Sequence, residues 1–171
     1  MAEQKDKPNA GYSLSAKGRL RLVSWERLVL AYYNDGGKNK GNCTYGYGTM
    51  VHRGVCTKEE MKLPVSLAKA EVKLNSGIRD AERGIKRNVT YSLNQEQFDA
   101  LVSLTYNAGI AGSGQVFTLI NNDKLQEAAD YMETEMVYSI QKGKRVLMPG
   151  LIRRRKEESA PFKMVSNEVE K

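Results

Sequence analysis

The segment Trp25–Gly48 reads WERLVLAYYNDGGKNKGNCTYGYG and changes its pattern twice. Its first part continues an apolar stripe at helical spacing, which predicts a helix over residues 15–33; the stripe is Leu22, Trp25, Val29 and Tyr32. Glycines then interrupt any helix, and the alternation of glycine and tyrosine after Thr44 predicts a strand. We therefore expect Glu26 at the edge of the buried helix face, Asp35 on the following loop and Thr44 on the strand.

The remainder of the chain predicts one small β-lobe and a longer helical region. Strand-forming residues between glycines place the β-lobe at residues 34–57, and helical patterns dominate residues 66–160. Thr57 and Glu60 form a capping-box pattern that predicts a helix start, and Pro64 interrupts that helix. Further helices are expected at 66–87, from Asn94 to a glycine cap at Gly109, and at 116–120, 124–136 and 151–160. The predicted class is α+β, with a β-sheet lobe inserted after an N-terminal helix and a cleft between the two lobes.

Composition favours a folded domain of moderate size. The 171 residues are 40% hydrophobic, which suits one domain. The net charge of +7 favours a polyanionic partner, or it only keeps a solvated basic surface. Residues 1–14 are expected to be a flexible lead-in, residues 15–160 the domain and residues 161–171 a tail. We expect neither a signal peptide nor a transmembrane segment. The lysines and arginines are spread along the chain without a nucleic-acid motif, so no nucleic-acid partner is expected.

The cysteines and the histidine allow few kinds of chemistry. The chain has one histidine, His52, and two cysteines, Cys43 and Cys56, whose spacing matches no common metal motif. We therefore expect neither a metal nor an organic cofactor. Cys43 and Cys56 either form a disulfide, if the protein works in an oxidising compartment, or are two small core residues.

A carboxyl at a helix edge, a carboxylate on the next loop and a hydroxyl on the next strand suffice to hydrolyse a glycosidic bond. With Asp35 nine residues after Glu26 and the block Thr44-Tyr45-Gly46-Tyr47-Gly48 following, the chain resembles the phage-type lysozymes, glycoside hydrolase family 24. The resemblance extends over residues 15–160, through two further blocks in the correct order: QEQFDALVS with YNAG at 95–109, and PGLIRRRKEE at 149–158. The loop between Asp35 and Thr44 is longer than in common members, and Thr49 stands where many members have histidine.

The resemblance implies a lysozyme-like fold and a muramidase. Glu26 would then be the general acid, while Asp35 and Thr44 would hold the attacking water, with inversion at the anomeric carbon. A separation of roughly 6.5–9.5 Å between the two carboxyls is expected for that outcome. Tyr106 and Asn107 either bind the N-acetyl groups of the sugars or only cap their helix. An arginine of the C-terminal block would pair with the acid, and which one stays open.

Two other functions remain possible from the sequence. A lytic transglycosylase needs the glutamate but not the water-holding pair, and a basic wall-binding module needs none of the three. The expected partner is bacterial peptidoglycan, and the expected state is a monomer, with an inhibitor or immunity protein as a possible ligand. We expect synthesis in the cytoplasm and action on the periplasmic cell wall, after release through a phage-encoded pore or secretion as an antibacterial effector.

Overall fold

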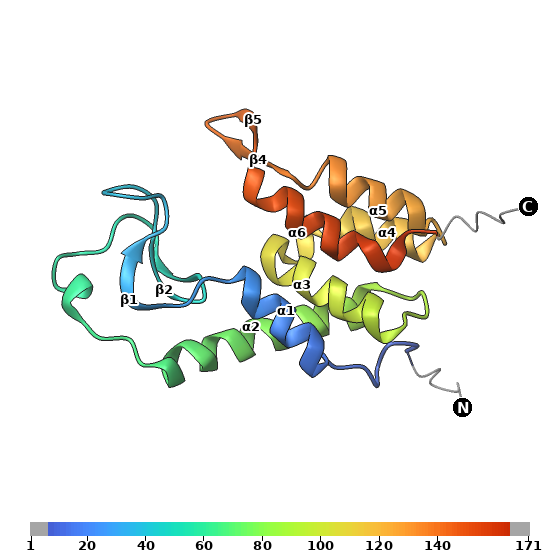
Figure 1. Ribbon diagram of the computed structural model, residues 1–171, viewed down its shortest axis with the longest axis horizontal. Coiled ribbons are helices and arrows are strands. Elements are labelled where there is room, and N and C mark those ends of the chain that lie inside the picture. The colour runs from blue at the N-terminus through green and yellow to red at the C-terminus, as the bar shows by residue number, and fades with distance from the viewer. Residues whose placement is uncertain (1–6, 165–171) are drawn as a thin grey trace, which may run out of the picture. The chain divides into compact units, whose positions relative to one another are not determined.

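The computed structural model describes residues 7–164. These residues form two compact units. One, the sheet unit, is Arg19–Asp80; the other, the helical unit, contains residues 7–18 and 81–164. Helices α1 (Ala16–Trp25) and α2 (Leu67–Asn88) each run from one unit into the other (Figure 1). The mixed composition of helices and a small antiparallel sheet confirms the predicted α+β class.

The sheet unit contains three antiparallel strands in chain order, β1 (Val29–Asn34), β2 (Cys43–Gly46) and β3 (Thr49–His52). The sequence pattern was misleading at β1, because helix α1 ends at Trp25 and does not continue to residue 33. Val29 and Tyr32 fit a helical stripe, but β-branched and aromatic residues also suit a strand. Pairing with β2 decides between the two, since it places Val29 opposite Gly46 and Tyr33 opposite Thr44.

The capping box at Thr57 forms, but the helix after it is short. Thr57 N donates to Glu60 Oε2 at 2.7 Å, and Glu60 N donates to Thr57 Oγ1 at 3.1 Å. Only the 3₁₀ turn η1 (Glu60–Lys62) follows, because Leu63 turns to an extended backbone before Pro64. Lys69 of α2 then donates to the Tyr32 hydroxyl at 2.8 Å and lies 4.9 Å from the Tyr45 ring centre, which attaches α2 to the sheet.

The helical unit is built around α3 (Gln95–Gly112), which carries a run of buried residues from Gln97 to Thr105. Asn94 and Gln97 form a reciprocal capping box at its start, and Gly109 interrupts its helical geometry with a φ of 76°. The helix start at Asn94 matches the prediction, whereas Gly109, predicted to cap the end of the helix, is a kink after which the helix continues to Gly112. The helices that follow α3 in this unit are α4 (Gly114–Asn121), α5 (Leu125–Thr134), α6 (Pro149–Ser159) and the 3₁₀ turn η2 (Ala160–Phe162).

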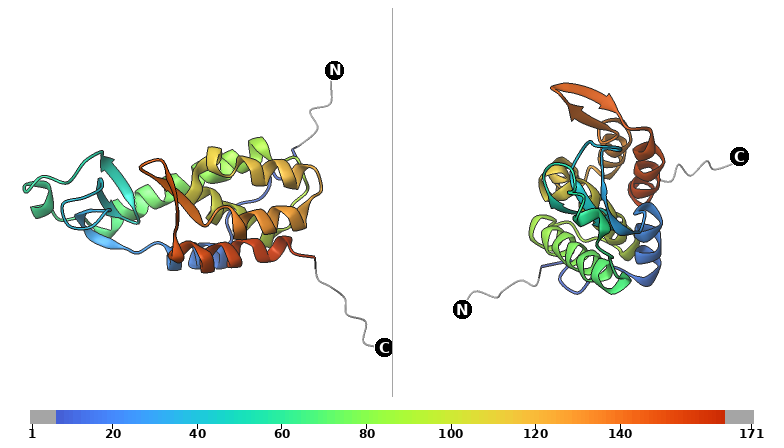
Figure 2. Two further views of the ribbon diagram at one scale, coloured as in Figure 1. Left: turned by 90° about the horizontal axis from the view of Figure 1, so that it is seen from above. Right: turned by 90° about the vertical axis from the view of Figure 1, so that its left-hand side faces the viewer.

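A second sheet was not predicted. Strands β4 (Tyr138–Gln141) and β5 (Lys144–Leu147) form a hairpin between α5 and α6, and the hairpin projects from the ends of these helices in both views of Figure 2. Its two-residue loop has positive φ at Lys142 and Gly143, the geometry that matches the twist of the adjoining strands.

The ends of the described chain are anchored. Asn9, expected in the flexible lead-in, is fully buried, and its side chain bonds to Val89 O, Tyr91 O and Leu93 N at 2.9–3.1 Å. Phe162, expected in the tail, is also buried. The predicted lead-in over residues 1–6 and the tail over residues 165–171 lie outside the described residues. Within residues 7–164, no helix combines the length and apolar character needed to cross a membrane.

Candidate active site

Glu26 follows directly after α1. Its backbone N donates to Leu22 O at 3.3 Å and to Val23 O at 3.2 Å, so the last helical turn fixes its position. The residue is partly buried, whereas Arg27 and Leu28 after it are exposed. Glu26 was expected within a helix over residues 15–33, but α1 ends at Trp25 and Glu26 is the first residue after it.

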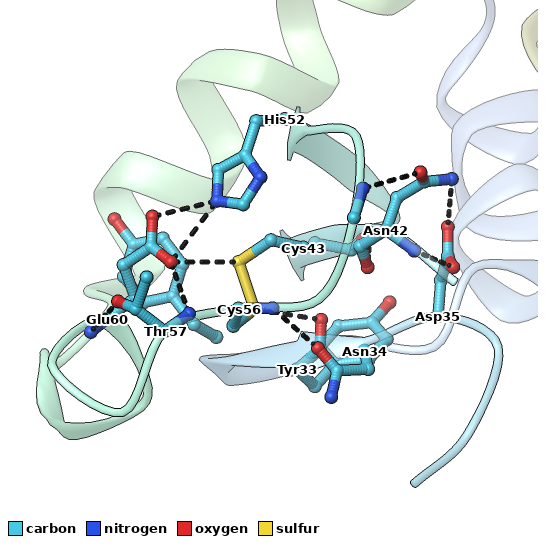
Figure 3. The surroundings of a disulfide bond; sticks show 12 residues. Tyr33, Asn34, Asp35, Asn42, Cys43, His52, Cys56, Thr57 and Glu60 are labelled. Atoms are coloured by element: carbon cyan, nitrogen blue, oxygen red, sulfur yellow. Dashed lines mark hydrogen bonds and ion pairs between the residues drawn. A yellow bond between two sulfur atoms is a disulfide. The ribbon is translucent and has the colours of Figure 1, made fainter. Parts of the chain in front are cut away.

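Asp35 closes the loop that joins β1 to β2. Its N donates to Asn42 O at 3.1 Å, and its Oδ1 accepts from Asn42 N at 2.7 Å (Figure 3). Gly41 has a φ of +84°, and a Cβ at that position would lie 2.1 Å from Asp35 Oδ1. Asp35 is therefore paired with Asn42 across the base of the long loop, next to the first residues of β2.

Thr44 lies in the middle strand and is 2% exposed. Its Oγ1 donates to Asn42 O at 3.3 Å. Asp35 and Thr44 therefore both contact Asn42, one through its backbone N and the other through its carbonyl. A carboxylate oxygen accepts more than one hydrogen bond, so the bonds to Asn42 leave Asp35 with acceptor capacity for water.

Tyr33 links the two carboxyl groups electrostatically. Burial raises the pKa of Tyr33, and the negative charges of Asp35 and Glu26 raise it further, while Arg27 lowers it. Both carboxylates therefore act on one phenol in the sheet unit. Tyr33 was not among the predicted site residues, because its position opposite Thr44 depends on strand pairing in a segment that was predicted to be helical.

The two cysteines are joined. Cys43 in β2 and Cys56 after β3 form a disulfide, which resolves the choice that the sequence left open. His52 lies beside them, with Nε2 3.0 Å from Glu60 Oε1 and Nδ1 2.9 Å from Arg53 O (Figure 3). The Arg53 carbonyl and the Glu60 carboxylate raise the pKa of His52.

Tyr106 and Asn107 lie near the end of the regular part of α3, in the helical unit. Asn107 lines a pocket of about 550 Å³ together with Tyr131, Tyr138 and Arg155. The Asn107 side-chain oxygen accepts from Arg155 Nη2, which leaves its amide NH₂ as a donor. Tyr138 lies in the hairpin that was not predicted, so its place in the same pocket as Asn107 was not predicted either.

The arginine block of α6 is not a uniformly solvated face. Arg154 and Arg155 are 4% and 2% exposed, and both bond to Glu158, which is 3% exposed. Glu158 Oε1 also accepts from Ser103 Oγ at 2.6 Å. This buried network attaches α6 to α3, whereas Arg153 is exposed.

Known proteins resemble the chain over most of its length. The profile of the phage lysozyme family matches residues 23–158. An endolysin from Acyrthosiphon pisum secondary endosymbiont phage 1 is 31% identical over 157 residues, which are 87% of this chain and 97% of that protein. Among similar solved structures, the endolysin from Escherichia coli O157:H7 phage FAHEc1 has 28% sequence identity and a TM-score of 0.73, and the match covers 89% of this chain and 94% of that chain. The muramidase domain of SpmX from Asticaccaulis excentricus has 27% sequence identity and a TM-score of 0.71, and the match covers 90% of this chain and 99% of that chain.

The fold and the family match define a glycoside hydrolase of the bacterial cell wall. The chain belongs to the phage lysozyme family. This confirms the resemblance seen in the sequence.

Proposed function

We propose that the protein is an inverting muramidase, which hydrolyses the β-1,4 bond between N-acetylmuramic acid and N-acetylglucosamine in peptidoglycan. Glu26 is the general acid that protonates the leaving oxygen. Asp35 and Thr44 hold the attacking water on the opposite face of the sugar, and Asp35 also stabilises the positive charge that develops on the ring.

The observation that carries this proposal is the shared contact of Asp35 and Thr44 with Asn42. It brings a carboxylate from the loop after β1 and a hydroxyl from β2 to one residue, as a common water would require. The exposed position of Asp35 gives water access, whereas the burial of Thr44 fixes its hydroxyl. The joint effect of Glu26 and Asp35 on the Tyr33 pKa supports a placement of both carboxyls around one region. A separation of roughly 6.5–9.5 Å between them remains the prediction for inversion.

In the helical unit, the Asn107 amide is a candidate donor to the carbonyl of a sugar N-acetyl group. Arg155 holds the Asn107 oxygen, so the amide NH₂ has a defined direction. Tyr106, one residue earlier, is proposed to contact the same sugar. Delivery as a phage endolysin or as a secreted effector, a monomeric state and an inhibitor or immunity partner are further proposals consistent with this activity.

The test is the loss of turbidity of purified Gram-negative peptidoglycan, with new reducing ends counted. Wild type should lower turbidity and generate reducing ends, and Glu26→Gln should slow both by at least about 100-fold, the typical value of a general acid. Glu71→Gln, an exposed glutamate of the same unit, is the matched control and should retain activity. Both variants need wild-type circular dichroism for the comparison.

The same assay separates the alternatives. A lytic transglycosylase would leave 1,6-anhydro ends instead of reducing ends and would tolerate Asp35→Asn. A wall-binding module would sediment with peptidoglycan but leave turbidity unchanged, with or without Glu26. Either result would refute the proposed hydrolysis.

A further inference from the structure

Four side chains with metal-binding atoms gather at one end of the sheet, in the sheet unit (Figure 3). The Sγ atoms of Cys43 and Cys56 and a carboxylate oxygen of Glu60 all lie within 4.8 Å of one another. Nε2 of His52 is 3.0 Å from Glu60 Oε1, and Cys43 Sγ is 3.9 Å from Glu60 Oε2. The two sulfurs are joined as a disulfide, and after reduction two thiolates, an imidazole and a carboxylate are side-chain types that bind Zn²⁺ in proteins.

The backbone holds each of these residues in place. Sheet register places His52 opposite Cys43, and Cys43 N donates to Gly54 O at 2.7 Å. Cys56 N donates to the Asn34 side chain at 2.8 Å, and the capping box with Thr57 fixes the Glu60 carboxylate. The cluster is therefore organised by strand pairing and by a local cap, and not only by the disulfide.

The orientation of His52 suits a cation. Its Nδ1 lies 2.9 Å from a backbone carbonyl, so this nitrogen carries the proton and donates it to Arg53 O. Nε2 of a neutral ring then presents a lone pair toward Glu60, whose oxygen also presents lone pairs. A favourable contact requires a proton or a metal ion between them. A backbone carbonyl bonded to the remote ring nitrogen is also the usual support of a metal-bound histidine.

We propose that reduction of the Cys43–Cys56 disulfide creates a tetrahedral Zn²⁺ site, with both sulfurs, His52 Nε2 and one Glu60 oxygen as ligands. A dithiol reductant supplies two electrons and two protons: the S–S bond breaks, two thiols form, and the reductant becomes a disulfide. Zn²⁺ then displaces the two thiol protons and any proton on His52 Nε2, and these are released to solvent.

The cluster would cross-link the sheet unit in either redox environment. Disulfides persist in oxidising compartments and are rare in reducing ones. In the first case the disulfide joins β2 to the segment after β3, and in the second Zn²⁺ would join β2, β3, that segment and η1. The spacing of cysteine and histidine gave no metal motif in the sequence, because the fourth ligand is a glutamate that the sequence assigned only to a helix cap.

The test uses the full chain, reduced with a phosphine that contributes no thiol, and titrated with Co²⁺ as the spectroscopic probe. We expect one Co²⁺ per chain, thiolate-to-cobalt charge-transfer absorption, and loss of that absorption when Zn²⁺ is added. The oxidised chain should show none of this. His52→Gln and Glu60→Gln should each weaken Co²⁺ binding at least about tenfold, as ligand-supporting groups already do. Glu59→Gln, an exposed neighbour, is the matched control and should bind as wild type does.

Two results would overturn the proposal. The first is a reduced chain that shows no charge-transfer absorption. The second is equal affinity in wild type, His52→Gln and Glu60→Gln, which would assign the binding to the thiols alone. If circular dichroism shows that the reduced chain unfolds, Zn²⁺ must restore the folded spectrum, and failure to restore it also refutes the site. Activity is not a readout in this test, so its outcome is independent of the proposed muramidase function.

Discussion

Glu158→Gln should destabilise the protein strongly, because Glu158 neutralises two buried arginines. The Glu158 side chain is 3% exposed and accepts from Arg154 Nε at 2.9 Å and from Arg155 Nη1. It also accepts from Ser103 Oγ at 2.6 Å. The amide would remove the charge and turn an NH₂ donor toward another donor, so the buried Arg155 guanidinium would lose its ion pair with Glu158.

Removing one partner of a buried ion pair costs about 3–5 kcal/mol, and this is the loss that we expect for Glu158→Gln. For a domain of this size, such a loss lowers Tm by about 10 °C or more. We would measure urea unfolding by circular dichroism, together with thermal unfolding. The control is Glu127→Gln on α5, whose ion pair with Lys124 is more than half exposed and should be worth less than about 1 kcal/mol. If both variants lost the same small amount, the argument from buried charge would be wrong.

Two further perturbations test the anchored N-terminal segment and the His52–Glu60 pair. Asn9→Ala removes three buried hydrogen bonds to the segment 89–93 and should cost about 2–4 kcal/mol in urea unfolding, whereas Gln115→Ala, at an exposed position of α4, should cost far less; equal costs would contradict the anchoring. The pKa of His52 is raised, so its stabilising effect is full below pH 6.5 and is lost as pH rises through the folded value. The pKa of Glu60 is lowered, chiefly by the Thr57 amide and then by His52, so its effect is present above pH 4.5 and is lost as pH falls through the folded value. The destabilisation by His52→Gln should therefore be larger near pH 5.5 than near pH 9, and a pH-independent loss in urea unfolding would refute the pairing.

Local signals in the sequence predicted most of the helical unit. The Asn94 capping box, the break at Gly109 and Pro149 at the start of α6 depend on residues a few positions apart. Such signals survive folding because their partners are already neighbours in the chain. The spacing of Glu26, Asp35 and Thr44 also came from the sequence. Their roles, however, rested on the resemblance and not on any local physical rule.

The sequence-based predictions were wrong mainly where contacts between distant segments determine the secondary structure. Val29–Asn34 satisfies both a helical and a strand pattern, and only the partner strand selects β1. The hairpin β4–β5 is different, since Lys142-Gly143 between two strand-forming segments is a local turn signal that is visible in the sequence. Asn9 resembles any polar lead-in residue until the segment 89–93 is folded against it.

Glu60 shows why the cluster at the disulfide could not be derived from the sequence. The pattern of Thr57 and Glu60 accounts fully for one role of the glutamate, as the reciprocal partner in a cap. That explanation leaves no unsatisfied feature in the sequence that would suggest a second role. The strand register brings His52 opposite Cys43, and the turn after Cys56 brings Glu60 to both of them. A carboxylate has two oxygens, so Oε2 can accept the hydrogen bond of the cap while Oε1 faces the imidazole. The proposed second role of Glu60 therefore uses lone pairs that the cap does not need.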